Sequence, residues 1–262
     1  MIKAVIFDVD GTLIDSVDLH ARAWHEIFVK YGVKTNFQTV RDQIGKGGDK
    51  LMKVFLSEER ISRQGKEIEA ERAKLFKRKY LPQVKPFPAL EGLFERLRSD
   101  EIKIAVGSSA KDDELEIYKE ITGIGPFLAE DTSSDDVSNS KPDPDIFRMA
   151  QKKLGIDPRH IIAIGDTKYD AESAGKAGMA TIGLLCGGSS PAKLRSAGCI
   201  ALYQDPADLL RNYDSSPLGK SKRSNNRLYF LMGLGVGAVV GILYAPKPGP
   251  KRQIFFAANP RG

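Results

Sequence analysis

Residues 3–12 read KAVIFDVDGT, a short apolar run followed directly by two aspartates, a glycine and a threonine. The run 3–7 lacks the alternation of apolar and polar residues that marks a strand with one wet face. It therefore predicts a strand that is buried on both faces. Asp8 and Asp10 follow at the end of this strand, where Gly11 lets the backbone bend around an anion. This stretch thus predicts a buried parallel strand that ends in a pair of carboxylates.

Three further apolar runs of the same kind are spaced along the chain, with helical patterns between them. They read KIAVG at 103–107, IIAIG at 161–165 and ATIGLL at 180–185. Apolar residues recur at helical spacing in Pro88–Ser99 and in Pro144–Leu154, and each segment opens with a proline, which suits a first helical turn. The alternation of strand and helix predicts an α/β, Rossmann-like core, in which helices cover both faces of a parallel sheet.

Residues 16–81 interrupt this alternation and predict an all-helical insert. Apolar residues recur every three or four positions from Val17 to Tyr31, where Ser16 can cap the helix and Gly32 can end it. A second, long and highly charged helical pattern runs from about Glu58 to Tyr80. The sequence thus divides into two predicted domains, an α/β core (1–15 and 82–213) and a helical insert (16–81).

The net charge of +6 is unevenly distributed along the chain. Residues 220–262 hold eight Lys or Arg and no Asp or Glu, which leaves −2 for residues 1–219. The body is therefore mildly acidic, and we expect no nucleic-acid partner for it.

Two features bear on the cellular compartment. The chain passes from Met1 directly into a strand pattern, without the basic lead and long apolar stretch of a secretory signal, so we expect the body in the cytoplasm. Cys186 and Cys199 have no ligand-like spacing. We expect them to act as small apolar side chains and not as redox or metal-binding groups.

Polar clusters follow two of the other predicted strands, and one more precedes a helix. Ser108 and Ser109 come directly after the strand at 103–107, and the sequence GDTKYD follows the strand at 161–165. In the segment SKPDP at 140–144, Pro142 excludes the helical conformation for Lys141, so this lysine lies in an extended turn before a helix. Taken alone, each cluster is also compatible with an ordinary loop or helix start.

Together, the clusters indicate a site for a phosphoryl group, because the exits of neighbouring parallel strands share one edge of the sheet, where ligands bind. Four carboxylates would meet there and repel one another strongly without cations, namely Asp8, Asp10, Asp166 and Asp170. Lys141 supplies one positive charge, and Mg²⁺, which prefers oxygen ligands, supplies two more. An acyl phosphate requires a carboxylate nucleophile, and a second carboxyl group can give and then take a proton. We therefore expect a Mg²⁺ cofactor and a phosphorylated substrate.

In order and residue type, these four clusters resemble the signature of the haloacid dehalogenase superfamily, and the resemblance covers residues 1–213. It implies that Asp8 is the nucleophile and Asp10 the general acid/base. The implied Mg²⁺ ligands are Asp8, the backbone carbonyl of Asp10, Asp166, and Asp170 acting through water. The expected phosphate-binding residues are Val9, Thr12, Ser108, Ser109 and Lys141. The resemblance further implies that the helical insert is a cap that closes over the substrate.

Within the superfamily, the residues around Asp15–Ser16, His20 and Ala23–Trp24 resemble both β-phosphoglucomutase and phosphoglycolate-phosphatase-like members. A mutase cap carries an arginine near the turn for a second phosphate, whereas this chain has GKGGDK at 45–50. This favours a phosphatase acting on a small phosphorylated metabolite. The alternatives are a sugar-phosphate mutase and a membrane-tethered scaffold without catalysis. The candidate substrate or cap residues are His20, Lys46 and Gly47, for which helix packing or a plain linker is the competing interpretation.

The C-terminal segment differs from the rest of the chain. Residues 214–227 are polar and basic and predict a linker, and 228–262 predict a glycine-rich, membrane-associated tail. Leu228–Ala245 is uncharged and would span about 27 Å as a helix, close to the ~30 Å hydrocarbon core. Its glycines at 233, 237 and 241 permit close helix pairing. The segment resembles the YtxH-like glycine-zipper family, and the alternative is an extension that packs on the body.

The tail yields the first prediction. Full-length protein should sediment with membranes and resist a high-salt wash, because Leu228–Ala245 is apolar and basic residues flank it. A variant ending at residue 218 should stay in the supernatant and keep most of its activity. Release of the full-length protein by salt would indicate surface charge attraction alone. Full-length protein that never sediments would contradict the anchor.

Overall fold

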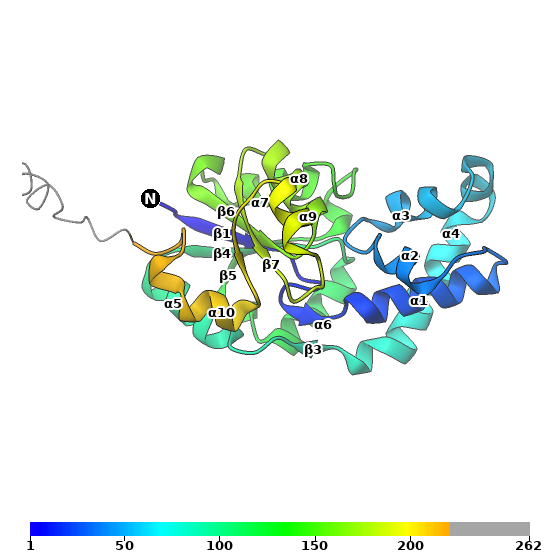
Figure 1. Ribbon diagram of the computed structural model, residues 1–262, viewed down its shortest axis with the longest axis horizontal. Coiled ribbons are helices and arrows are strands. Elements are labelled where there is room, and N and C mark those ends of the chain that lie inside the picture. The colour runs from blue at the N-terminus through cyan, green and yellow to red at the C-terminus, as the bar shows by residue number, and fades with distance from the viewer. Residues whose placement is uncertain (221–262) are drawn as a thin grey trace, which may run out of the picture. The chain divides into compact units, whose positions relative to one another are not determined.

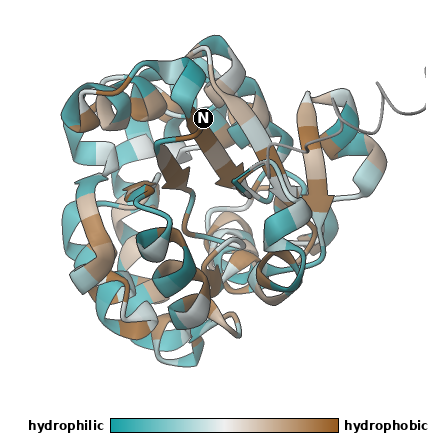
Figure 2. Cartoon of the chain, turned by 90° about the vertical axis from the view of Figure 1, so that its left-hand side faces the viewer, coloured by the Kyte–Doolittle hydropathy of each residue, from teal (hydrophilic) through white to brown (hydrophobic). Residues whose placement is uncertain are grey.

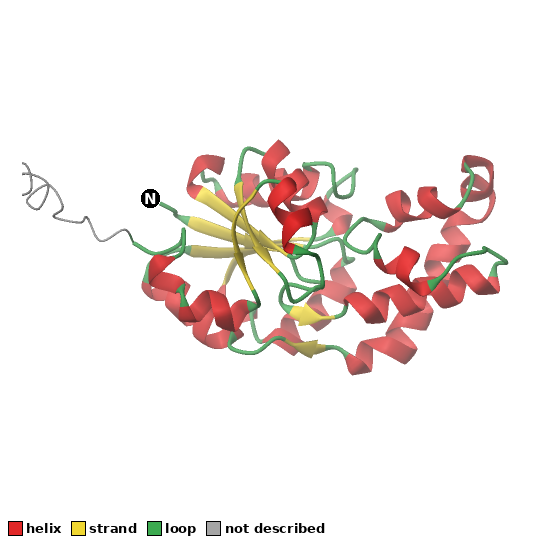
Figure 3. Ribbon diagram, in the orientation of Figure 1, coloured by secondary structure: helices red, strands yellow, loops and turns green. Residues whose placement is uncertain are grey.

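The computed structural model describes residues 1–220 and shows a six-stranded, entirely parallel sheet (Figures 1 and 3). In spatial order the strands are β5 (Leu128–Thr132), β4 (Lys103–Gly107), β1 (Ala4–Phe7), β6 (Ile161–Gly165), β7 (Ala180–Leu184) and β8 (Cys199–Tyr203). The predicted parallel α/β sheet is confirmed. Strands β5 and β8 were not predicted, because they are the two edge strands and are only partly buried, so neither forms a fully apolar run.

Helices connect successive strands and cover both faces of the sheet (Figure 1). The core helices are α5 (Leu90–Ser99), α6 (Asp112–Thr122), α7 (Asp145–Leu154), α8 (Lys168–Lys176), α9 (Pro191–Ser196) and α10 (Pro206–Arg211). Two prolines were predicted to lie in first helical turns and instead precede their helices. Pro144 is the N-cap residue of α7, and Pro88 stands two positions before α5.

The two faces of the sheet differ in side-chain size, because alternate residues of each strand point to opposite sides. On one face, large residues such as Phe7 and Val106 pack against α5, α6 and α10. On the other face, smaller residues such as Ala4 and Ala105 lie in one apolar cluster with residues of α7 and α8. Figure 2 shows the strands as a hydrophobic centre surrounded by helices of mixed polarity.

The inserted segment is helical, as predicted, and has a hydrophobic cluster of its own that includes Trp24 and Phe28. Its helices are α1 (Val17–Lys30), α2 (Phe37–Arg41), α3 (Gly48–Phe55) and α4 (Glu58–Leu75), followed by a π-helical turn at Phe76–Tyr80. These helices form the cap of the fold. The chain enters and leaves the cap through a short antiparallel pair, β2 (Ile14–Asp15) and β3 (Lys85–Pro86), which holds the two connections side by side.

The predicted C-terminal helix at 228–245 lies outside the described residues, as do residues 221–227 of the predicted linker. Within 214–220, Leu218 is buried against the main apolar cluster and Lys220 lies 3.3 Å from Asp100. Within residues 1–220, no helix is both long and apolar enough to cross a membrane.

Candidate active site

The strand order brings three of the predicted clusters to one edge of the sheet. β1 lies between β4 and β6, with Phe7 in register with Val106 and with Ile164. The next residues along the three strands lead to Asp8, Ser108 and Asp166, so these side chains follow neighbouring strand ends. Ligands of open α/β sheets bind at such a point, where the order of strand connection reverses.

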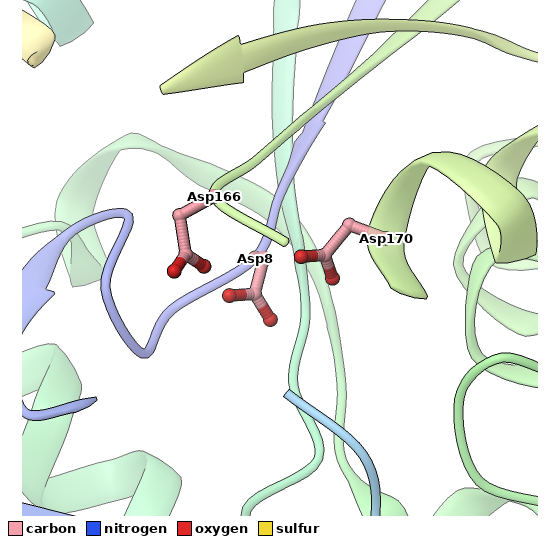
Figure 4. Close-up of side chains that lie close together, drawn as sticks. All are labelled: Asp8, Asp166 and Asp170. Carbon is pink, nitrogen blue, oxygen red and sulfur yellow. The ribbon is translucent and has the colours of Figure 1, made fainter. Parts of the chain in front are cut away.

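Asp8, Asp166 and Asp170 form a buried cluster at this edge. One carboxylate oxygen from each residue lies within 4.8 Å of one from each of the other two. All three residues are at most 6% exposed. Figure 4 shows Asp8 between the other two, with Asp166 in the loop after β6 and Asp170 at the start of α8. The three carboxylates converge on a shared space.

The local environment opposes ionisation of this cluster. Burial, together with the carboxylate of Asp170, raises the pKa of Asp8 to about 7. Burial and the carboxylates of Asp170 and Asp8 raise the pKa of Asp166 well above its usual value. Moreover, Asp166 Oδ2 is buried without a hydrogen-bond partner. Three converging carboxylates with an unpartnered buried oxygen fit a hard divalent cation such as Mg²⁺, which prefers oxygen ligands.

Lys141 provides the permanent positive charge of the site. Its Nζ lies 2.5 Å from Asp8 Oδ1 and 2.9 Å from Asp170 Oδ1, and it donates to the carbonyl oxygen of Gly107 at 3.0 Å. Burial alone would lower the pKa of Lys141, but the carboxylates of Asp170 and Asp8 outweigh it and raise that pKa. The ammonium group is therefore held charged between two carboxylates at the end of β4.

Two glycines allow the backbone to approach Asp166 closely. Gly11 has a φ of +78°, and a Cβ atom there would lie 2.5 Å from Asp166 Oδ2. A Cβ atom at Gly187, in the loop after β7, would lie 1.7 Å from the same oxygen. Both positions therefore exclude any larger residue while Asp166 keeps this orientation.

Four of the predicted phosphate-binding residues follow the ends of β1 and β4. Thr12 Oγ1 lies 3.5 Å from both Asp8 Oδ2 and Asp166 Oδ1. The Val9 carbonyl accepts hydrogen bonds from the amides of the following turn. Ser108 is buried, and its Oγ accepts a hydrogen bond from the amide of Ala110 at 3.0 Å, whereas Ser109 is partly exposed.

Asp10 is held by two residues at the start of the cap domain: Ser16, the N-cap residue of helix α1, and His20, within α1. Its Oδ1 accepts hydrogen bonds from Ser16 Oγ at 2.6 Å and from His20 Nε2 at 2.9 Å. Burial would raise the pKa of Asp10, but His20 and Ser16 together lower it. Ser16 is the N-cap residue of α1, as predicted, but its hydroxyl makes no capping hydrogen bond and donates to Asp10 instead.

The loop between α2 and α3 lies against the core loops that carry Lys141 and Asp166. A Cβ atom at Gly45 would lie 2.6 Å from Thr167, and one at Gly47 would lie 2.2 Å from Ser140. Asp49 accepts a hydrogen bond from Ser140 Oγ at 2.5 Å. The cap loop therefore closes directly over the catalytic edge.

Lys46 lies beside this contact and does not touch the carboxylate cluster. Its Nζ donates to Gln43 Oε1 at 2.6 Å and lies 5.1 Å from the ring centre of Tyr169. The Nζ of Lys168 lies at the same distance from that ring. Burial, aided by the charge of Lys168, lowers the pKa of Lys46.

A cavity of about 300 Å³ lies between the cap and the core and reaches Asp166. Arg41, Asp42 and Gln43 line it from the cap, and Gly187 and Lys193 line it from the core. The Arg41 guanidinium bridges the two sides, because it donates to Asp18 at 2.6 Å and to the carbonyl oxygen of Gly187 at 3.2 Å. Residues of both the cap and the core thus line the cavity.

Comparison with known proteins assigns the chain to a family. Residues 5–184 match the haloacid dehalogenase-like hydrolases. The chain belongs to this family. It is 29% identical to a pyrophosphatase of Oceanobacillus iheyensis, over 69% of this chain and 82% of the relative. It is 27% identical to a phosphorylated carbohydrates phosphatase of Thermotoga maritima, over 79% and 96%. It is 26% identical to a phosphoglycolate phosphatase of Aquifex aeolicus, over 81% and 97%.

Solved structures agree with this assignment. A hydrolase from Pseudomonas syringae has a TM-score of 0.75 and 29% identity, over 81% of this chain and 98% of that one. CbbY from Rhodobacter sphaeroides in complex with phosphate has a TM-score of 0.63 at 24% identity, over 80% and 96%, which shows the shared fold. The protein is thus a phosphatase of the haloacid dehalogenase-like family, a phosphoric monoester hydrolase.

Several residues around this phosphatase site were not singled out from the sequence. Arg41 and Gly187 line the cavity, and Tyr118 and Glu114 contact His20 from α6. One of these positions carried a readable signal: Gly187 belongs to a Gly-Gly-Ser-Ser run directly after an apolar strand. The others lie on helices where nothing local distinguishes them from surface or core residues.

The carboxylate cluster predicts a pH-dependent response to Mg²⁺. Adding Mg²⁺ should raise the melting temperature, and by more at about pH 8 than at about pH 5.5. Since the folded-state pKa of Asp8 is raised to about 7, its contribution to the stability of the metal-free protein is lost as the pH rises through that value. The cation offsets this loss, whereas at low pH it must displace a proton. Thermal melts with Mg²⁺ or chelator at constant ionic strength provide the measurement, and equal shifts at both pH values would contradict the assignment.

Proposed function

We propose that this protein is a magnesium-dependent phosphatase that hydrolyses a small phosphomonoester through an aspartyl-phosphate on Asp8. The arrangement of Asp8 carries the proposal. This carboxylate lies at the end of β1, in contact with the Lys141 ammonium and within a group of oxygens suited to a cation. A carboxylate in such surroundings can attack phosphorus while the negative charge of the phosphoryl oxygens is neutralised.

In the first step, an Asp8 oxygen forms a bond to phosphorus as the bond from phosphorus to the leaving oxygen breaks. Asp10 gives a proton to that oxygen, which leaves as an alcohol. Ser16 and His20 both bind Asp10 Oδ1, and Oδ2 has no hydrogen bond to another described residue. We therefore assign the proton transfer to Asp10 Oδ2.

In the second step, a water oxygen forms a bond to phosphorus and the bond between phosphorus and Asp8 breaks. Asp10 takes a proton from this water, which returns both carboxyl groups to their starting states and releases phosphate. Lys141, which is ion-paired with Asp8 and Asp170, supplies positive charge beside the phosphoryl group. The contact of Gly45 and Gly47 with the core loops limits the entry of further water.

Asp8, Asp166 and the backbone carbonyl of Asp10 would hold the Mg²⁺, with Asp170 acting through water. When bound, the cation neutralises charge on the phosphoryl oxygens. Asp170 is already positioned for a supporting role. Its Oδ2 accepts hydrogen bonds from the Thr167 amide at 3.0 Å and from Thr167 Oγ1 at 2.6 Å, while its Oδ1 lies beside Lys141.

Hydrolysis is favoured over the mutase alternative by the composition of the cap loop. No arginine stands at 45–50 to hold a second phosphate, and Lys46 is directed to Gln43 and Tyr169. Three relatives named above are phosphatases by name. A non-catalytic scaffold conflicts with the enzyme family and with the full set of catalytic residues.

Two substitutions test the mechanism with a panel of small phosphomonoesters. Asp8→Asn should abolish phosphate release, because an amide cannot form the acyl phosphate, and it should fold normally because it removes one repulsive charge. Asp10→Asn should lower the rate by about 10²–10⁴-fold, since only proton transfer is lost. Substantial activity in Asp8→Asn would rule out the covalent route. Recovery of an isomerised phosphate ester without free phosphate would establish the mutase.

We further propose that the leaving group occupies the cavity between Arg41 and Lys193 and carries a second anionic group. Arg41, Lys168 and Lys193 line this cavity. Among the described residues, neither Lys168 nor Lys193 has a carboxylate within 4.0 Å, whereas Arg41 is paired with Asp18. Two lysines without ion-pair partners at the mouth of a cavity that reaches Asp166 are suited to a carboxylate or a phosphate on the substrate.

Reversing the charge of Lys193, which lines the cavity, tests this proposal. Lys193→Glu should raise KM about three- to tenfold for phosphomonoesters that carry a second negative charge, and leave KM for neutral ones unchanged, as expected for an exposed charge contact. Arg195→Glu is the matched control, because Arg195 lies on the same helix α9, is exposed, and does not line the cavity. Equal effects of the two variants, or of either variant on both substrate classes, would refute the subsite.

A further inference from the structure

A chain of buried polar groups extends from Asp10 into the core, beyond the residues that the mechanism uses. Tyr118 and Glu114 stand one turn apart on α6 and are 1% and 6% exposed. The Tyr118 hydroxyl lies 3.2 Å from His20 Nε2 and donates to Glu114 Oε1 at 2.7 Å. The order of contacts is therefore Asp10, His20, Tyr118, Glu114.

The chemistry of these groups decides the direction of each hydrogen bond. A carboxylate offers only acceptors, so Tyr118 gives its single proton to Glu114 and its oxygen must accept from His20. Asp10 Oδ1 likewise accepts, since the proton that the mechanism uses resides on Oδ2. His20 Nε2 faces both oxygens, at 2.9 Å from Asp10 Oδ1 and at 3.2 Å from Tyr118. Only an Nε2 that carries a proton satisfies both contacts.

The tyrosine hydroxyl keeps its proton in this environment. Burial, together with the charges of Asp10 and Glu114, raises the pKa of Tyr118 well above its ordinary value. The His20 ring is held on its face as well, because it stacks on Phe76 with a centroid separation of 3.9 Å and an interplanar angle of 6°. The hydrogen bonds of Nε2 thus hold the edge of the His20 ring, and the stacking on Phe76 holds its face.

We propose that Tyr118 and Glu114 are positioning residues that hold the Nε2–H of His20 on Asp10 Oδ1, and thereby leave Oδ2 aimed at the leaving group. This rests on the proposed role of Asp10 as general acid. Without the Tyr118–Glu114 pair, the ring loses its second hydrogen bond and the carboxyl of Asp10 loses its fixed orientation. Proton delivery to the leaving oxygen then becomes slower, while binding of the phosphoryl group is unaffected.

A purely structural role for the pair is the competing explanation. Burial of a glutamate is costly, and an apolar pair of similar volume would pack as well in many cores. The two roles differ in how the rate depends on the leaving group. A misplaced acid slows only substrates whose leaving oxygen needs a proton, whereas a loosened fold slows all substrates alike.

The test compares kcat/KM for Tyr118→Phe on p-nitrophenyl phosphate, which has a good leaving group, and on a series of alkyl phosphates, which do not. We expect a loss of less than about threefold for the aryl ester and about tenfold or more for the alkyl esters, with little change in KM. Tyr80→Phe is the matched control, because the Tyr80 hydroxyl also donates to a glutamate, Glu26, and does not contact His20.

A second variant and a double mutant complete the experiment. Glu114→Leu should reproduce the selective loss on alkyl esters, and it replaces Tyr118→Phe if that protein does not fold. Tyr118→Phe added to Asp10→Asn should cause no further selective loss, because both act on one proton transfer. If Asp10→Asn slows alkyl esters selectively but Tyr118→Phe and Glu114→Leu slow both classes equally or neither, this inference is wrong and the proposed function stands. If Asp10→Asn itself shows no such selectivity, the acid role of Asp10 fails first.

Discussion

Asp8, Asp166 and Asp170 place carboxylate oxygens within 4.8 Å of one another in a buried region, and their mutual repulsion has to be offset for the fold to persist. Lys141 supplies part of the compensation, since its ammonium contacts two of the three. Burial and the neighbouring carboxylates raise the pKa of Asp8 and of Asp166 despite the charge of this lysine. The three carboxylates are therefore suited to a divalent cation, which would offset the charge that Lys141 leaves uncompensated.

The cap contributes to the same site with its first helix and with its last helical turn. Its first helix, α1, brings His20 to Asp10, and the π-helical turn at its end brings Phe76 onto one face of the His20 ring. Between them, the loop at 45–47 lies against Thr167 and Ser140 of the core. A single insertion after β1 therefore supplies both the contact to Asp10, the proposed acid/base group, and the loop that lies against the core beside Lys141 and Asp166. The short β2–β3 pair keeps the two connections together.

Much of the catalytic site could be predicted from local sequence. Asp8, Asp166 and Asp170 follow buried strands, and the structure brings them together with Lys141 at one edge. Ser16 occupies the N-cap position that the sequence predicted, but only the fold shows that its hydroxyl donates to Asp10. His20 could be proposed as a candidate from the sequence, but its contact with Asp10 could not be predicted, since a histidine on an amphipathic helix can also pack in the core or face solvent.

The amino-acid sequence by itself determined the parallel α/β core, the helical insert and the cluster of carboxylates. Hydrophobic period and strand-end chemistry are local properties, and neighbouring strand exits must share an edge. Only the tertiary structure decided which distant residues meet: the Arg41 side chain with the Gly187 carbonyl, and His20 with Tyr118, ninety-eight positions further along the chain. Such contacts depend on how helices pack and turn about their axes, which no local pattern specifies. The same is true of the edge strands β5 and β8, whose partial burial hides the apolar signal that marks the central strands.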